Sequence, residues 1–227
     1  MKIENLSFKF KPTDDHYFFH HLCAEFVPNR VHFIQGQNGV GKSTLFNILQ
    51  GNMAKDALLE GAVTLDGTTY TAHNNTLPCA FTQQVQTVQQ QYDRMLANQF
   101  SFLQNLQLAN LPACPGLHAL PSATLELIAP LGIDLHKPAY LLSGGQRQLL
   151  AILMALQKPT KLLLLDEPTA TLDTDNTQLV MQFLFKLAEQ LNVTMLIICH
   201  DKELVAQYAQ GSSYMLRKLA SGERGLE

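Results

Sequence analysis

The stretch GQNGVGKST, residues 36–44, follows the apolar run VHFI and leads into TLFNILQ, whose apolar residues have helical spacing. It matches GxxxxGKS/T in full, and such a glycine-rich turn lets backbone N–H groups converge on phosphates at the start of a helix. Lys42 would place its charge beside the β- and γ-phosphates, and Ser43 would offer its hydroxyl to Mg²⁺. The expected nucleoside triphosphate site therefore comprises Gly36, Gln37, Asn38, Gly39, Val40, Gly41, Lys42, Ser43 and Thr44. The motif alone leaves the base open, because GTPases and small-molecule kinases share it.

Length and composition describe a globular chain that can bury a sizeable core. It has 227 residues, of which 46% are hydrophobic. The longest apolar runs, LLLLD and MLIIC, have the length of strands, whereas a bilayer-spanning helix needs roughly 18 apolar residues. The opening MKIENLSF lacks the apolar centre of a secretory signal, so we expect a cytoplasmic protein that does not cross a membrane.

Charge and cysteine usage narrow the classes of partner. The formal net charge of −3 gives no basic footprint, so nucleic-acid binding is not expected. The cysteines are scattered and form no CxxC pair, which favours reduced, buried thiols: Cys23, Cys79, Cys114 and Cys199. The neighbouring His20 and His21 lack further ligands at metal-binding spacing, so they are not interpreted as a metal site.

Short β-like runs alternate with helical patterns along most of the chain, which predicts an α/β fold. AVTLDGTTY is predicted to form a hairpin with Asp66-Gly67 at its turn, and LPCAFTQQ (77–84) a strand that ends at paired glutamines. Between 85 and 141 apolar residues fall near helical spacing on either side of LPACPG, which indicates an inserted helical block. Strands are predicted at KLLLLD, TMLIICH and SYMLRK, a helix at about 174–191, and a turn and tail at SGERGLE.

Two later stretches carry candidate chemistry. LLLLDEP ends an apolar strand in Asp166 and Glu167, at the strand end where ligands bind in parallel sheets. Asp166 would hold Mg²⁺ through water, and Glu167 would accept a proton from a water that attacks the γ-phosphate. In LLSGGQRQ, Ser143, Gly144 and Gly145 open a helix and offer a hydroxyl and backbone N–H groups to an anion. One triphosphate rarely needs two such helix ends, unless the second serves another copy of the protein.

These motifs together resemble those of the ATP-binding subunits of ABC transporters, over essentially the full chain. GQNGVGKST resembles the Walker A motif, LLLLDEP the Walker B motif with its adjoining glutamate, and LSGGQ, which includes Gln146, the family signature. In the same order, Gln83 is similar to the Q-loop glutamine, Asp173 in ATLD to the D-loop aspartate, and His200 to the switch histidine. Phe10 in LSFKF stands where the family stacks an aromatic ring on adenine, with Phe8 and Tyr17 as competitors for that role.

The resemblance implies an ABC ATPase fold, which is a P-loop NTPase core with an N-terminal antiparallel β subdomain and an inserted α-helical subdomain. Residues 1–84 and 157–227 would form the core and 85–156 the helical subdomain. It implies ATP and Mg²⁺ as ligands, and a head-to-tail dimer with a second ATP-binding subunit in which two ATP molecules are sandwiched. Gln83 would sense Mg²⁺ and the membrane partner, His200 would contact the γ-phosphate, and Asp173 would reach across the dimer.

The resemblance also implies membrane-spanning transporter subunits, which would hold the protein at the inner face of the membrane. Leu149 and Met154 depart from the family pattern, which commonly has arginines there. Three alternatives compete with this interpretation: a soluble ABC-type ATPase in DNA repair or translation, another P-loop kinase or GTPase, and a non-hydrolysing binding module. The chain has neither a coiled-coil insertion nor an NKxD element, and it keeps Asp166, Glu167 and His200, so we expect competent ATP hydrolysis.

Overall fold

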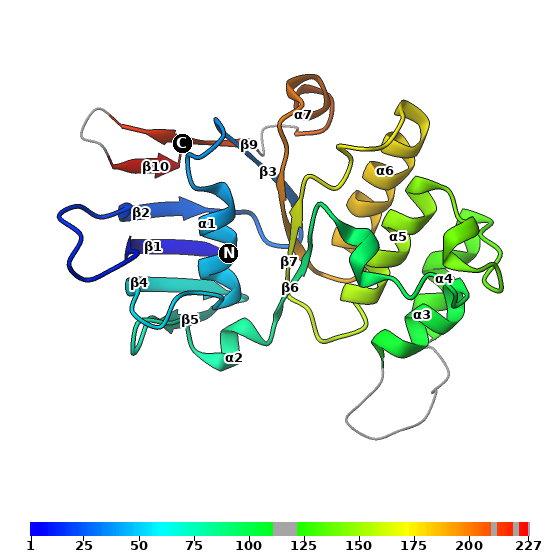
Figure 1. Cartoon of the computed structure of the whole chain (residues 1–227), viewed down its shortest axis with the longest axis horizontal. Coiled ribbons are helices and arrows are strands. Elements are labelled where there is room, and N and C mark those ends of the chain that lie inside the picture. Colours follow the sequence, from blue (N-terminus) through cyan, green and yellow to red (C-terminus); the bar gives the residue numbers. More distant parts are fainter. Residues whose placement is uncertain (111–121, 210–212, 220–222, 227) are drawn as a thin grey trace.

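Helix α1 (Lys42–Gln50) lies between two β-sheets, and further helices cover the far face of the larger sheet (Figure 1). This computed structural model describes residues 1–110, 122–209, 213–219 and 223–226. The predicted break LPACPG lies outside the described residues. No helix of the described chain is long and apolar enough to cross a membrane.

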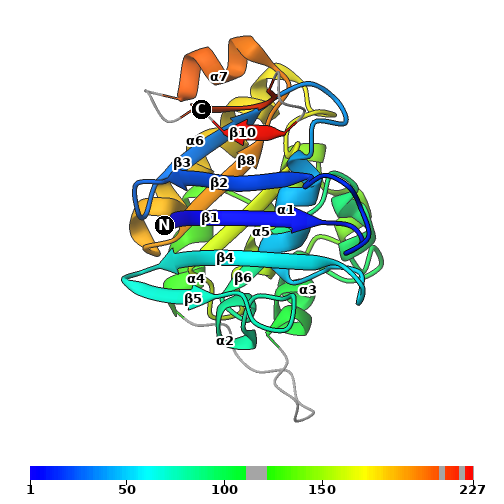
Figure 2. The ribbon, with the colours of Figure 1, turned by 90° about the vertical axis from the view of Figure 1, so that its left-hand side faces the viewer.

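The smaller sheet is antiparallel, with the order β2-β1-β4-β5. Its strands are β1 (Lys2–Lys9), β2 (Phe19–Glu25), β4 (Leu58–Leu65) and β5 (Thr68–Thr71). Asp66 and Gly67 both have positive φ angles, 50° and 78°, so the β4–β5 hairpin turns where the sequence predicted it. Figure 2 shows this sheet face on, with β10 beside β2.

The larger sheet has six strands in the order β10-β9-β3-β8-β7-β6. They are β3 (Val31–Gln35), β6 (Val85–Val88), β7 (Leu162–Asp166), β8 (Thr194–Ile198), β9 (Ser213–Lys218) and β10 (Arg224–Leu226). All pairings are parallel except that of β10 with β9. The carboxyl ends of β3, β6, β7 and β8 therefore meet at one edge, where a parallel sheet presents its ligand site.

The helices are α1, α2 (Cys79–Thr82), α3 (Phe102–Ala109), α4 (Ser122–Ile128), α5 (Gly144–Ala155), α6 (Thr174–Gln190) and α7 (Lys202–Tyr208), with 3₁₀ turns at Tyr92–Met95, Ala129–Leu131 and Ala139–Leu141. Figure 1 places α3, α4, α5 and α6 on the side of the large sheet that faces away from α1. The segment predicted as helical, 85–156, begins with β6, which pairs with β7 and so belongs to the sheet. The division into a core and a helical subdomain otherwise stays a prediction.

Alternate residues of β7 pack into two separate apolar clusters, one on each face of the sheet. Leu162 and Leu164 join the cluster that contains α1 and the small sheet, whereas Leu163 and Leu165 join the cluster of the helical side. All four are fully buried, which explains why this strand is a continuous apolar run. Leu149 is also fully buried in the helical-side cluster, so an apolar side chain there is satisfied by packing.

Three local predictions were wrong. Cys23 and Cys79 are exposed rather than buried, whereas Cys199 is buried as predicted and Cys114 lies outside the described residues.

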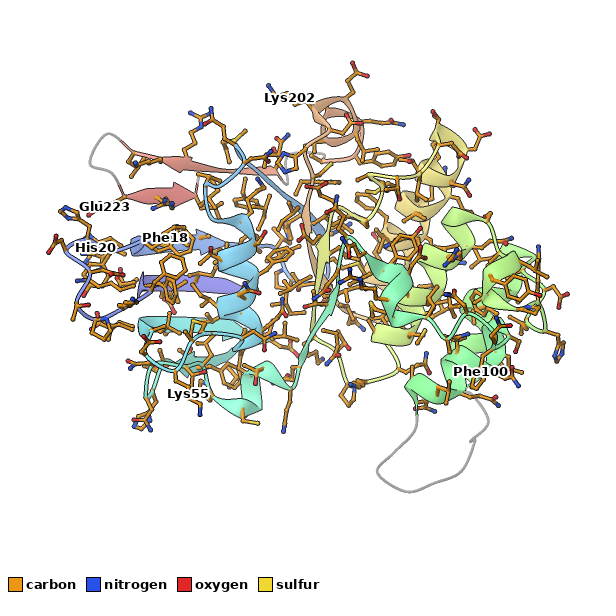
Figure 3. All side chains as sticks on the ribbon, viewed as in Figure 1. Phe18, His20, Lys55, Phe100, Lys202 and Glu223 are labelled. Atoms are coloured by element: carbon orange, nitrogen blue, oxygen red, sulfur yellow. The ribbon has the colours of Figure 1, made fainter. Side chains whose placement is uncertain are left out.

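Residues 77–84 do not form a strand: α2 follows Pro78, and the strand begins only at Val85. The tail is not irregular either, because β10 pairs with β9 and the Nδ1 of His20 in β2 lies 2.7 Å from a carboxylate oxygen of Glu223. The C-terminal hairpin is thereby joined to the small sheet, and Figure 3 shows His20 and Glu223 close to each other.

Candidate nucleotide site

The phosphate-binding loop, residues 36–44, connects β3 to α1. Gly36 and Gly41 have φ angles of 150° and 115°, and a Cβ at either position would lie within 2.6 Å of another atom, Leu216 O or Phe18 Cε1. Both positions therefore require glycine for conformation and for space. The N-terminus of α1 has neither an acidic residue in its first turn nor a side-chain cap, so its N–H groups remain available to an anion.

Lys42 is folded back over the loop and is only 6% exposed. Its Nζ donates to the carbonyl oxygens of Gly36 at 2.8 Å and Gln37 at 3.1 Å. Burial lowers the pKa of Lys42, and the charges of Glu167 and Asp166 oppose that shift. The Lys42 ammonium would bind an anionic phosphate more strongly than it binds these two neutral carbonyl oxygens, which fits a role in phosphate binding.

Asp166 and Glu167 follow β7 at the same edge of the sheet. Burial raises the pKa of Asp166 and the charge of Glu167 raises it further, while Lys42 and His200 act in the opposite direction. Glu167 has φ of 49°, which is uncommon for a residue with a side chain, and its N–H donates to Ile198 O at 3.0 Å. The backbone strain is thus held in place by β8, and Glu167 is the one residue of the described chain with positive φ that is not Gly, Asn, Asp or His, the types that adopt this conformation more readily.

Two polar side chains hold the carboxylate of Glu167. The amide of Gln90 donates to Oε2 at 3.1 Å, and the Nε2 of His200 lies 3.1 Å from Oε1. His200 follows β8, and the next residue, Asp201, caps α7 by accepting from the N–H groups of Glu203 and Leu204. The cap fixes the path of the chain at His200, so the imidazole is directed to Glu167 by the local fold.

Gln83 does not lie where the sequence predicted it. It ends α2 and precedes β6, so it stands at the amino end of a parallel strand, opposite to the site edge. Gln90, just beyond the carboxyl end of β6, contacts Glu167 instead. A usable signal was present in the sequence: VQTV is a β-type run, and its end points to the glutamines that follow it, Gln89 and Gln90.

A cavity of about 320 Å³ joins these groups. The described residues that line it are Asn38, Gly39, Gly41, Lys42, Ser43, Thr44, Gln90, Asp166, Glu167, Ile198 and His200. It thus combines backbone and ammonium donors with a hydroxyl and two carboxylates, a set suited to phosphates and to a hard divalent cation. Residues 142–146 of the signature are not part of this lining.

The signature turn begins α5 on the helical side of the sheet. Ser143 and Gln146 form a reciprocal capping box: the Ser143 hydroxyl accepts from Gln146 N at 3.2 Å, and the Gln146 side chain accepts from Ser143 N at 3.1 Å. The hydroxyl of Tyr92, shortly after Gln90, donates to Gly144 O at 3.3 Å. The segment that supplies Gln90 is therefore in direct contact with the signature.

Asp173 and Phe10 lie outside the cavity lining. Asp173 is the N-cap of α6, where it accepts from Asn176 N at 2.8 Å. Phe10 is 48% exposed, with its ring centroid 4.8 Å from that of Phe18, the ring that contacts Gly41 in the phosphate-binding loop. Of its two competitors, Phe8 is buried and the ring of Tyr17 stacks on His20, so Phe10 is the most exposed of the three rings.

Comparison with known proteins is consistent with this geometry. The sequence profile of the ABC transporter family matches residues 19–170. A tyrosine transport ATP-binding protein of Clostridioides difficile is 32% identical over 92% of this chain and 85% of its own length; the methionine import ATP-binding protein MetN of Vibrio cholerae is also 32% identical, over 79% of this chain but only 52% of its own. The dimeric ATP-binding cassette MJ0796, solved in a post-hydrolysis state with ADP and Pi, covers 95% of this chain with a TM-score of 0.64 and 24% identity, which supports the fold alone.

The chain belongs to the ABC transporter family, as an ATP-binding subunit with the ABC ATPase fold. The family prediction and the fold class drawn from the sequence are confirmed. The chain spans about half the length of the MetN relative, and the rest of that relative has no counterpart in this sequence.

Proposed function

We propose that this protein hydrolyses ATP with Glu167 as the general base and so drives separate membrane-spanning subunits of a transporter. The observation that carries the proposal is the position of Glu167. Its carboxylate is held by Gln90 and His200 at the edge of the cavity that Lys42 and Ser43 line. A carboxylate there could accept the proton of a water that attacks a phosphate bound in the loop.

The residues present fit ATP and one Mg²⁺. The N–H groups of the loop and Lys42 would bind the β- and γ-phosphates, and the exposed ring of Phe10 would stack on adenine. Ser43 and Asp166 would hold the Mg²⁺, which neutralises the charge that develops on the phosphate oxygens. Gln90, rather than Gln83, would then contact the metal and report its presence to the helical side. His200 would hold the γ-phosphate and keep Glu167 oriented.

We infer from the position of the signature that a second copy of this chain, or a related subunit, completes the nucleotide site. Ser143, Gly144, Gly145 and Gln146 are absent from the lining of the phosphate-loop cavity, yet they form a helix start of the same anion-binding type. In a head-to-tail dimer, each signature would meet the nucleotide on the partner's loop, with Asp173 reaching across the same interface. ATP would then bind the closed dimer better than the open one, which is the energetic basis of coupling.

The test is the ATPase rate of the purified protein and of Glu167→Gln with Mg²⁺ present. We expect hydrolysis by the parent, and a loss of most turnover in the variant with ATP binding retained. Hydrolysis by Glu167→Gln at the parent rate would refute the assignment of the base.

The transport role has its own test, since the named relatives are transport proteins but the partner of this chain is inferred. A tagged copy purified from membranes in mild detergent should carry a multi-spanning membrane protein in near-stoichiometric amount, at the cytoplasmic face. A chain that instead carries ribosomes or nucleic acid, or nothing, would support the second candidate, a soluble ABC-type ATPase without a transport role.

A further inference from the structure

Asn176, in the first turn of α6, contacts two segments that the proposed dimer uses. Its backbone N–H donates to Oδ1 of Asp173 at 2.8 Å, and its side-chain amide donates to Oδ1 at 2.9 Å and to Oδ2 at 2.8 Å. Both hydrogen-bonding groups lower the pKa of Asp173. Asn176 is therefore the main neighbour that orients this carboxylate, with a smaller contribution from the backbone of Asp175.

The other end of the same side chain contacts the signature. A carboxylate can only accept hydrogen bonds, so the NH₂ of Asn176 must face Asp173 and its carbonyl oxygen must face the opposite way. There the hydroxyl of Ser143 donates to Asn176 Oδ1 at 3.3 Å. The same hydroxyl accepts from Gln146 N, so both its donor and an acceptor position are in use.

The side-chain amide of Asn176 packs directly against Gly145 in the signature turn. A Cβ built at Gly145 would lie 2.3 Å from Asn176 Oδ1 and 2.9 Å from Asn176 Cγ. Gly145 has no positive φ angle, so it is the amide of Asn176, rather than a backbone requirement, that excludes a side chain. Asn176 can therefore occupy this position only because residue 145 is glycine.

We propose that Asn176 is a positioning residue that fastens the Asp173 segment to the signature turn, so that the two meet the second subunit as one unit. The inference rests on the proposed dimer, in which both segments face the same partner. Two loops that must each be ordered on closure lose conformational freedom at that step, and a link that orders them beforehand reduces the cost. The residue acts through Ser143 and Asp173 and touches no reacting atom.

The experiment compares Glu167→Gln with the double variant Glu167→Gln/Asn176→Leu. Leucine has nearly the size of asparagine, but its side chain can hydrogen-bond neither to Asp173 nor to Ser143; only the backbone N–H bond to Asp173 remains. We expect the ATP concentration at half-maximal dimerisation, followed by light scattering at fixed protein concentration, to rise about fivefold or more, since each of two copies loses its links. With Glu167 intact, Asn176→Leu should raise KM by a similar factor while kcat falls less than about twofold.

Controls separate this effect from a folding defect. Gln182→Leu places the same apolar residue on an exposed position of α6 and should leave the dimerisation midpoint unchanged. Binding of a fluorescent ATP analogue at protein concentrations too low for dimers should be equal in parent and Asn176→Leu, because the phosphate-binding loop is untouched.

Three results would overturn the proposal. One is an unchanged midpoint in the Asn176→Leu variant, and another is an equal loss of analogue binding by the single subunit. The third is parent behaviour of Asn176→Asp, which keeps an acceptor for Ser143 but repels Asp173. If Glu167→Gln itself does not dimerise with ATP, the proposed dimer fails first, and the role of Asn176 fails with it.

Discussion

Replacing Gln90 by alanine tests the part of the site that only the structure locates. The side-chain amide of Gln90 donates a hydrogen bond to the Glu167 carboxylate at 3.1 Å. The change removes this donor and leaves His200 as the remaining side-chain contact of the carboxylate among the described residues. Glu167 would then be free to turn away from the phosphates on a backbone that is already in an uncommon conformation.

The expected size follows from the kind of bond. A hydrogen bond to a charged group contributes about 1.5–3 kcal/mol. If the bond is needed to hold Glu167 for proton transfer, its loss should lower kcat by roughly 10- to 150-fold, because 1.4 kcal/mol corresponds to a factor of ten. ATP binding should change much less, since the loop and Lys42 are intact.

The assay is steady-state ATP hydrolysis by the parent, Gln90→Ala and Gln83→Ala under the same conditions. Gln83 is exposed at the opposite end of β6, so Gln83→Ala should keep kcat within about twofold of the parent. A low rate in Gln83→Ala together with a normal rate in Gln90→Ala would refute the reasoning and restore the assignment based on the sequence alone.

Three further changes test separate features. Gly145→Ala puts a Cβ 2.3 Å from the α6 amide and should cost about 1–3 kcal/mol of stability by thermal unfolding, whereas Gly144→Ala meets only the end of a leucine at 3.1 Å and should cost less; equal effects would contradict the packing. Asp166→Asn should stabilise the nucleotide-free protein by about 0.5–2 kcal/mol, because burial penalises the charged carboxylate. Because the pKa of Asp166 is raised in the folded protein, the extra stability of Asp166→Asn should be complete above that pKa and should vanish as the pH falls through it toward 3.8. A stability difference between variant and parent that grows at low pH would contradict the direction of this pKa shift. Phe10→Ala should weaken ATP binding about tenfold through lost stacking, whereas Phe100→Ala, at the far end of the molecule in Figure 3, should not; equal affinities would remove Phe10 from the base site.

Motifs whose chemistry depends on a contiguous stretch were predictable from the sequence. Residues 31–44 and 162–167 each combine an apolar strand with the polar residues that follow it, so their place at one edge of a parallel sheet follows from the strand pattern. The structure gives both stretches that arrangement and brings Lys42, Asp166, Glu167 and His200 to one cavity.

Gln90 was missed although the run VQTV points to it, and Asn176 could not be found from the sequence at all. The helix α2 has only four residues, too short for a periodic pattern, so the run before Gln83 resembled a strand and shifted the site end of β6 by several residues. The contact of Asn176 with Ser143 joins residues 33 positions apart on two helices. No local pattern reports such a contact, because it depends on how α5 and α6 pack.

ATP should close two subunits on each other when hydrolysis by Glu167 is blocked. The molar mass of Glu167→Gln in solution, measured by light scattering with and without ATP, tests this closure. We predict a shift from the 25.3 kDa of one chain to twice that mass on adding ATP, and no shift when Lys42→Ala is also present. A mass that stays at that of one chain with saturating ATP bound would show that two identical chains do not close on ATP.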